Sequence, residues 1–237
     1  MDEGEIEARG EEAGLNPMFG NWTKTFHLEP VPCTGNAAAR RAFTTAVRAE
    51  LRNRFVFVGE IKLSIGLYLS QQKMLEDPAY GDLCNHARQF LDTLKGNGGL
   101  FIDDSQVENL EVGWMPAGGE SAFQVAIEAG QDDFLPLPVR LFEMPDGLLY
   151  PLSEQTWTPD GPQGVPESQT LALAHALAGM TARQRAFRHD LRQNGAAPLP
   201  ARRYGRGLAP VLMGFHPARV ADSGFEVVPL RAWRHAG

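Results

Sequence analysis

The sequence predicts an α+β fold, in which a small mixed sheet with two helices is followed by an irregular and helical C-terminal extension. Two periodic patterns carry this prediction. Apolar residues recur at every second position in some segments, as half-buried strands require, and at every third or fourth position in others, as helices require. With 237 residues and 43% hydrophobic content, the chain can fill a sizeable core.

The first elements are predicted from local patterns. Residues 21–32 alternate loosely and end in prolines, which predicts a short strand. Residues 34–55 predict a helix, because apolar residues recur at four-residue spacing among alanine and arginine. Residues 59–70 predict the most regular strand, because their apolar side chains follow strict period two.

A second helix and two more strands complete this domain. The helix is predicted to begin at Asp82, which suits the N-cap position and precedes an apolar stripe. Residues 107–115 and 121–130 predict strands that the turn-like PAGGE joins as a hairpin. We therefore assign residues 21–130 to one compact domain, preceded by an acidic, disordered tail of residues 1–20.

The C-terminal extension comprises residues 131–237, and its role does not follow from the sequence. Residues 134–166 are dense in proline and glycine, so we interpret them as a connecting segment with short extended pieces. Residues 167–195 predict one long helix with Leu171, Ala174, His175 and Ala178 inside. Its arginines lie toward its C-terminal end, where the helix dipole favours them.

Charge is distributed unevenly along the chain. The net charge of −7 lowers the expectation of nonspecific nucleic-acid binding, yet residues 181–237 hold ten arginines against three acids, a sum of +7. Tyr204 lies among arginines in the segment ARRYGRG, where a ring can stack on a base while arginines hold the backbone. A basic loop without a specific partner is the alternative. The predicted nucleic-acid-binding residues of this cluster are Arg202, Arg203 and Arg206.

The sequence predicts a cytoplasmic protein that does not cross a membrane. It contains no stretch of about 18 apolar residues, and its acidic N-terminus lacks the basic and then apolar regions of a signal peptide. Its two cysteines, Cys33 and Cys84, suggest no disulfide framework.

The candidate chemistry lies in one unit, GDLCNHARQFLDTLKGNGGLFIDDSQV, over residues 81–107. A helix that begins at Asp82 and a strand that begins after Asp103 and Asp104 supply carboxylates from two elements. Carboxylates are the ligands that Mg²⁺ or Mn²⁺ prefers, and such an ion can activate water and stabilise charge on a scissile phosphate. The alternative interpretation is an N-cap aspartate and a polar turn.

This unit resembles the signature of the RusA family of Holliday junction resolvases. In that signature a helix opens with Asp-x-Asp-Asn, continues through a lysine to Asp-x-Leu, and is followed by Asp-Asp-Ser-Gln-Val at the start of a strand. The resemblance covers roughly residues 26–129 and none of the C-terminal hundred or so. The matching residues are Asp82, Asn85, Asp92, Leu94 and the run from Asp103 to Val107.

The resemblance implies an α+β homodimer with two Mg²⁺ sites that cuts symmetric strands of a four-way DNA junction. It implies Asp82 and Asp104 as metal ligands with Asp103 in support, and it places Arg88 where the family has a lysine that can meet a phosphate. The expected function is therefore a metal-dependent endonuclease acting on branched DNA such as Holliday junctions.

Two departures from the family signature define the alternative. Cys84 stands where the family has its second aspartate, and a neutral thiol supplies no charge, while a soft thiolate is a poor Mg²⁺ ligand. Arg88 keeps the positive charge of the lysine but cannot donate a proton at ordinary pH. The alternative is a catalytically inactive RusA-like module that binds DNA or another protein.

Overall fold

The computed structural model describes most of the chain as an α+β protein, as expected. Contacts divide it into two compact units: Met1–Phe134 with Pro159–Gly161, and Leu135–Thr158 with Pro162–Gly237. The described residues are 15–16, 20–51, 54–77, 80–117, 119–130, 132–158, 161–195 and 213–234. The acidic tail predicted over residues 1–20 lies outside them except for Leu15, Asn16 and Gly20.

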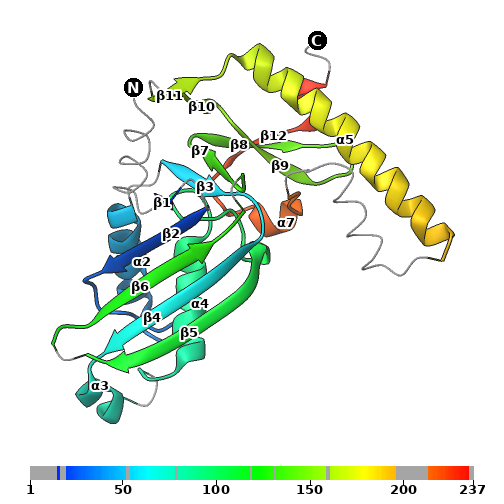
Figure 1. Ribbon diagram of the computed structural model, residues 1–237. Helices are drawn as coiled ribbons and strands as arrows, with labels where there is room; N and C mark the ends of the chain where they lie inside the picture. Colours follow the sequence, from blue (N-terminus) through cyan, green and yellow to red (C-terminus); the bar gives the residue numbers. More distant parts are fainter. Residues whose placement is uncertain are drawn as a thin grey trace. The chain divides into compact units, whose positions relative to one another are not determined.

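The first unit is built on a five-stranded mixed sheet with the order β1-β2-β6-β4-β5 (Figure 1). Strand β4 lies between β6 and β5, and it runs parallel to β5 and antiparallel to β6. Every second side chain of β4 is buried, as the period-two pattern predicts. The strands are β1 (Leu15–Asn16), β2 (Asn21–Phe26), β4 (Ile61–Leu69), β5 (Val107–Pro116) and β6 (Ala122–Glu128).

Helices α2 (Ala37–Leu51) and α4 (Leu83–Leu94) cover one face of this sheet (Figure 1). Phenylalanine rings fill the space between the layers. Phe90 of α4 packs edge-on against Phe123 of β6, with ring centroids 4.8 Å apart, and Phe123 stacks on Phe26 at 4.7 Å. Both predicted helices are confirmed, and the short α3 (Gln71–Glu76) lies between β4 and α4.

The predicted hairpin between β5 and β6 is wrong, because β4 lies between these two strands. The connection after Pro116 therefore passes the end of β4. The reason lies in the side chains: Leu110, Trp114 and Met115 of β5 are 38%, 41% and 52% exposed, whereas the apolar face of β4 is covered. An exposed strand suits the edge of a sheet, and the apolar strand β4 takes an interior position between β6 and β5.

The strand β3 (Phe55–Phe57) of the first unit is fully buried. Phe134, the first residue of β7 (Phe134–Pro136), packs edge-on against Phe55 and Phe57, with ring centroids 6.1 and 6.5 Å apart. These aromatic contacts hold residues close to the unit boundary against its core.

The second unit has its own three-stranded sheet, with the order β12-β8-β9, and its own hydrophobic core. Phe142, Leu152, Leu177 and Trp233 belong to that core. The strands are β8 (Val139–Glu143), β9 (Leu149–Ser153) and β12 (Glu226–Val228), with β10 (Gln155–Thr158) paired to β11 (Gly161–Gly164). The helices are α5 (Glu167–Gln193), α7 (Pro217–Val220) and α8 (Leu230–Trp233).

Residues 134–166 contain the short extended pieces that were expected, and two of these, β8 and β9, pair in the sheet of the second unit. Pro151 lies in β9, an edge strand, which is the position in a sheet that tolerates proline. The long helix α5 is confirmed, but His175 is exposed, although it was expected inside. No helix within the described ranges combines the length and hydropathy needed to cross a membrane.

Candidate functional site

Asp82 is the N-cap of α4, as predicted. Its Oδ1 accepts hydrogen bonds from the backbone N–H groups of Cys84 at 2.9 Å and Asn85 at 3.3 Å, and its Oδ2 accepts one from the Asn85 side chain at 3.0 Å. These bonds satisfy N–H groups that the helix leaves unpaired, and the negative charge suits the helix N-terminus. Such a cap contributes about 1 kcal/mol to stability. The Asp82 carboxylate therefore has a structural role as a helix cap, which is separate from the metal-binding role that the resemblance implies.

The first turn of α4 is held by Cys33. The Cys33 thiol donates to Asn85 Oδ1 at 3.3 Å, and the Cys33 N–H donates to the Asn85 carbonyl at 3.0 Å. Cys84 is exposed, and Arg88 is exposed one turn further along the same helix face. Both residues that depart from the family signature therefore face outward.

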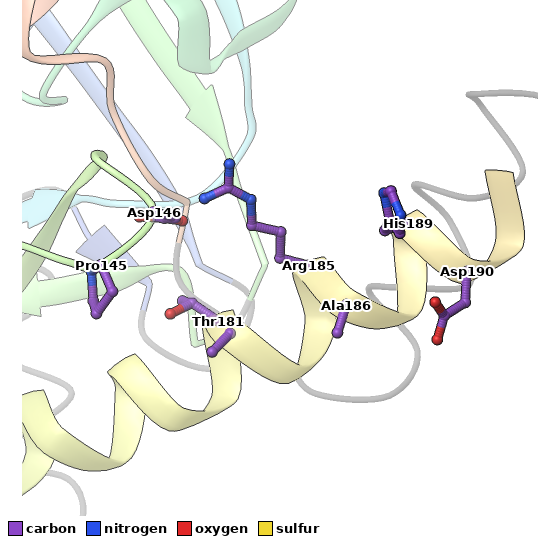
Figure 2. A pocket seen from close by; sticks show the side chains of 8 residues that line it. Pro145, Asp146, Thr181, Arg185, Ala186, His189 and Asp190 are labelled. Carbon is purple, nitrogen blue, oxygen red and sulfur yellow. The ribbon is translucent and has the colours of Figure 1, made fainter. Parts of the chain in front are cut away.

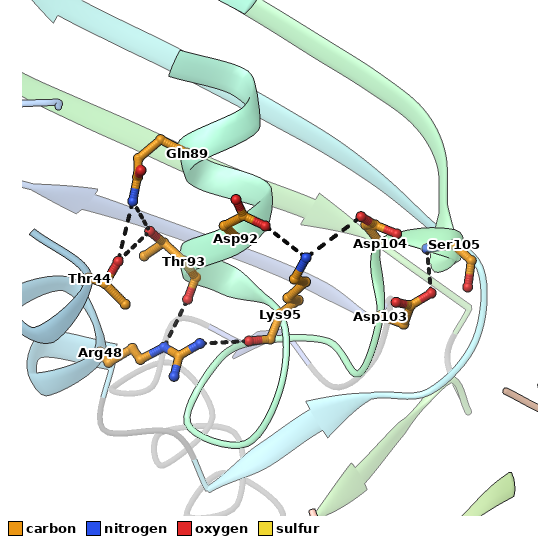
Figure 3. Close-up of polar contacts among 9 residues, drawn as sticks. All are labelled: Thr44, Arg48, Gln89, Asp92, Thr93, Lys95, Asp103, Asp104 and Ser105. Atoms are coloured by element: carbon orange, nitrogen blue, oxygen red, sulfur yellow. Dashed lines mark hydrogen bonds and ion pairs between the residues drawn. The ribbon is translucent and has the colours of Figure 1, made fainter. Parts of the chain in front are cut away.

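Lys95 joins two carboxylates at the other end of α4 (Figure 3). Its Nζ lies 2.7 Å from Asp92 Oδ1 and 3.9 Å from Asp104 Oδ2. The hydrogen bond to Asp92 is the largest cause that raises the pKa of Lys95, and the charges of Asp92 and Asp104 add to it. Asp92 thus bonds the loop that follows the helix, and Lys95 is a site residue that the sequence analysis missed.

Asp103 caps the short 3₁₀ helix η1 (Asp104–Gln106) and is only 4% exposed. Its Oδ1 accepts a hydrogen bond from the Ser105 N–H at 3.0 Å. The Asp-x-x-Gln spacing from Asp103 to Gln106 is that of a capping box, in which the two side chains bond each other's backbone. The adjacent aspartates are thus explained in part by the turn they form.

Gln106 is a fully buried residue whose role the sequence analysis also missed. Its Oε1 accepts hydrogen bonds from the N–H groups of Ile102 at 2.7 Å and Asp103 at 3.0 Å. Its side-chain amide donates to the carbonyls of Phe57 at 3.0 Å and Gly59 at 2.9 Å. One side chain therefore ties the two-aspartate turn to the end of β3. The capping-box spacing was the signal that points to it.

The structure brings Asp103 and Asp104 together but places Asp82 elsewhere. Asp82 precedes the first residue of α4, whereas Asp104 approaches Lys95, which follows the last. The 12 residues of α4, at about 1.5 Å rise each, span roughly 18 Å. Oxygen ligands lie about 2.1 Å from a bound Mg²⁺, so one ion cannot contact both carboxylates within one chain.

A single chain therefore does not fit the metal site that the RusA resemblance implies. Among the residues that the structure describes, no group of three or more His, Cys, Asp or Glu side chains is arranged to hold a metal ion. Arg202, Arg203 and Arg206 lie outside the described residues, and their role in binding nucleic acid stays a prediction.

Comparison with known proteins adds no relative: no protein-family model matches the sequence, and no curated protein matches it. The likeness to RusA resolvases thus rests on the motif residues of this chain, from Asp82 to Val107.

His86 in the first turns of α4 is fully buried. Its Nε2 lies 2.6 Å from the carbonyl oxygen of Tyr80, and its ring meets the Tyr80 ring edge-on at 5.9 Å. Burial is the largest influence on the pKa of His86 and lowers it from the ordinary value.

Acidification below about pH 6.5 is expected to destabilise the first unit through His86. The unfolded histidine takes up a proton near its ordinary pKa of about 6.5. The buried ring has a lowered pKa and stays neutral until the pH is lower. Stability from this group is therefore complete above pH 6.5 and falls as the pH decreases from there. Urea unfolding between pH 8 and pH 5 measures the effect. A His86→Leu variant should lose this pH dependence, and equal slopes in both proteins would contradict the expectation.

Proposed function

We propose that this protein is a metal-dependent endonuclease that acts on branched DNA as a homodimer. One observation carries the proposal: both halves of the RusA-like motif occupy the elements that the resemblance implies. Asp82 opens a helix, and the Asp-Asp-Ser-Gln-Val segment opens strand β5, within one mixed α+β unit. A bound Mg²⁺ or Mn²⁺ would supply charge stabilisation and an activated water at the scissile phosphate.

Within one chain, the length of α4 keeps Asp82 and Asp104 too far apart to bind the same ion. A homodimer removes this conflict. The two carboxylates can share an ion only if they come from different chains, so Asp82 of one chain would act with Asp104 of the partner subunit. A two-fold axis then generates two equal sites. Two equal sites suit symmetric cutting of a four-way junction.

The edge of the sheet at β5 supports association with a second copy. Within the described residues, no strand pairs with the outer side of β5, and Leu110, Trp114 and Met115 are exposed there. An exposed edge strand with apolar side chains favours pairing with another chain. Because β5 follows η1 directly, a partner at this edge would lie next to Asp104.

Mixing two inactive variants is expected to restore cleavage. In homodimers of Asp82→Asn or of Asp104→Asn, every shared site lacks one carboxylate. In a mixed dimer, one site lacks both carboxylates and the other keeps both, so one working site remains. The measurement is cutting of a synthetic four-way junction in Mg²⁺ and in Mn²⁺ after the two variants are unfolded and refolded together.

Each variant refolded alone, and the unmixed native protein, are the controls. An inactive mixture beside an active native protein would place the site within one chain and overturn the shared arrangement. A native protein that cuts neither a junction nor linear duplex in either metal would overturn the nuclease proposal.

Cys84 and Lys95 favour a second candidate function, a RusA-like module that binds branched DNA without cutting it. Cys84 presents a thiol where the family has a carboxylate. Lys95 already provides a positive charge to Asp92 and Asp104, as a metal ion would. For this candidate, the same experiment would give junction binding without cleavage.

A further inference from the structure

One stripe of α5 changes its chemistry halfway along the helix. Its first half packs on the core of the second unit through side chains at helical spacing: Thr170, Ala174, Leu177 and Thr181, all of them buried. The same spacing continues to positions 185, 188 and 192, which are all arginine. Arg185 and Arg192 are exposed. Beyond Thr181 the buried stripe therefore gives way to exposed arginines, and Arg185 and Arg192 form what we call the arginine row.

This half of α5 concentrates positive charge in an acidic protein. Residues 182–193 hold four arginines and one aspartate, a net charge of +3, whereas the whole chain carries −7. In the described part of the chain, neither Arg185 nor Arg192 forms an ion pair. Positive charge of this density is typical of a surface that binds a polyanion.

Arg185, the first member of the arginine row, borders a hollow of about 400 Å³ beside the turn between β8 and β9 (Figure 2). Residues that line it include Pro145 and Asp146 from the turn and Thr181, Arg185, His189 and Asp190 from α5.

Two carboxylates line this hollow, and their negative charge disfavours a small anion bound inside it. Asp146 accepts hydrogen bonds from the Leu148 N–H at 3.1 Å and from the Tyr150 hydroxyl at 2.8 Å, so it is engaged within the turn. Asp190 also lines the hollow. A small anion enclosed there would meet both carboxylates, whereas an extended chain of phosphates can follow the arginine row outside the hollow.

We propose that Arg185 and Arg192, with His189 beside them on α5, bind the sugar-phosphate backbone of DNA. The choice of DNA rests on the proposed function. Arginine presents several N–H donors that match phosphate oxygens, and phosphate contacts position a protein on DNA without reading its sequence. The second unit thereby holds a DNA arm, while the motif residues of the first unit act on the branch.

The test is the salt dependence of junction binding, measured by fluorescence anisotropy in Ca²⁺ between 50 and 300 mM NaCl. Each phosphate contact contributes about 0.9 to the slope of log K against log salt concentration. The Arg185→Gln/Arg192→Gln variant is expected to lower the magnitude of that slope by about 1.8.

A matched control removes the same charge elsewhere in the second unit. Arg183→Gln/Arg231→Gln changes one exposed arginine about 200° around α5 from Arg185 and one exposed arginine on α8. This control should keep the native slope, and circular dichroism should show the same helix content in all three proteins.

The remaining outcomes separate this inference from the proposed function. Equal slopes in all three proteins, with junction cleavage retained, would contradict DNA binding by Arg185 and Arg192. The proposal of nuclease activity would then be unaffected. A native protein that binds no DNA would overturn both. A polyglutamate peptide that binds the native protein but not Arg185→Gln/Arg192→Gln, with DNA binding unchanged, would replace DNA with an acidic protein segment.

Discussion

Replacing Gln106 with alanine is expected to lower the free energy of unfolding of the first unit by about 4 kcal/mol. The substitution removes four hydrogen bonds and leaves two N–H groups and two carbonyls buried without their partner. An unsatisfied buried group costs about 1 to 3 kcal/mol, and the cavity adds to that cost. Urea denaturation followed by circular dichroism measures the change.

Two further variants test whether these bonds are the cause. Gln106→Glu keeps the shape of the side chain but turns a carboxylate oxygen toward the carbonyls of Phe57 and Gly59, so it should destabilise nearly as much. Ser105→Ala changes an exposed neighbour in the same turn and should stay within about 0.5 kcal/mol of the native protein. Native stability in Gln106→Ala would refute the structural role of this side chain.

Replacing Cys84 with aspartate is expected to increase metal-dependent cleavage of a four-way junction by at least about tenfold. The change restores an oxygen ligand to an exposed position two residues from Asp82, and Mg²⁺ prefers oxygen to sulfur. Aspartate in the first turn of a helix is also favoured by the helix dipole. The fold should therefore tolerate the substitution, and single-turnover rates in Mg²⁺ and Mn²⁺ measure its effect.

Cys84→Ser is the matched control, because it removes the thiol without adding charge, and it should cleave at the native rate. Cleavage that appears only in Cys84→Asp would identify the native protein as a binding module whose chemistry one substitution recovers. Equal rates in all three proteins would show that position 84 supplies no metal ligand.

The individual elements could be predicted because their signals are local. The strict alternation in β4 and the N-cap at Asp82 each depend on a few neighbouring residues, and both are confirmed. Strand order is not local in this sense. The short link after Pro116 fits either a hairpin or a step past one strand, and the burial of β4 decides between them.

The candidate site could be predicted only in part. The N-cap at Asp82 was predicted from its position before an apolar stripe, and a polar turn at Asp103 and Asp104 was the alternative to metal binding. The capping box at Asp103 was not predicted, although its Asp-x-x-Gln spacing is visible in the sequence. The separation of the two capping residues depends on tertiary contacts, such as those of Arg48, which donates to the carbonyls of Thr93 at 3.0 Å and Lys95 at 2.8 Å (Figure 3). A distant arginine that holds the end of a helix leaves no pattern in the sequence near that helix.

The parallel pairing of β4 with β5 has a consequence for the lifetime of the site. All motif residues from Asp82 to Gln106 lie in the single crossover between these strands, so they assemble only when that long loop closes. Detachment of the edge strand β5 would release the two-aspartate turn while α4 stays packed on α2. The site thus has its own opening equilibrium, which amide hydrogen exchange along β5 reports. A partner chain paired with β5 would suppress this opening, which makes site order depend on protein concentration.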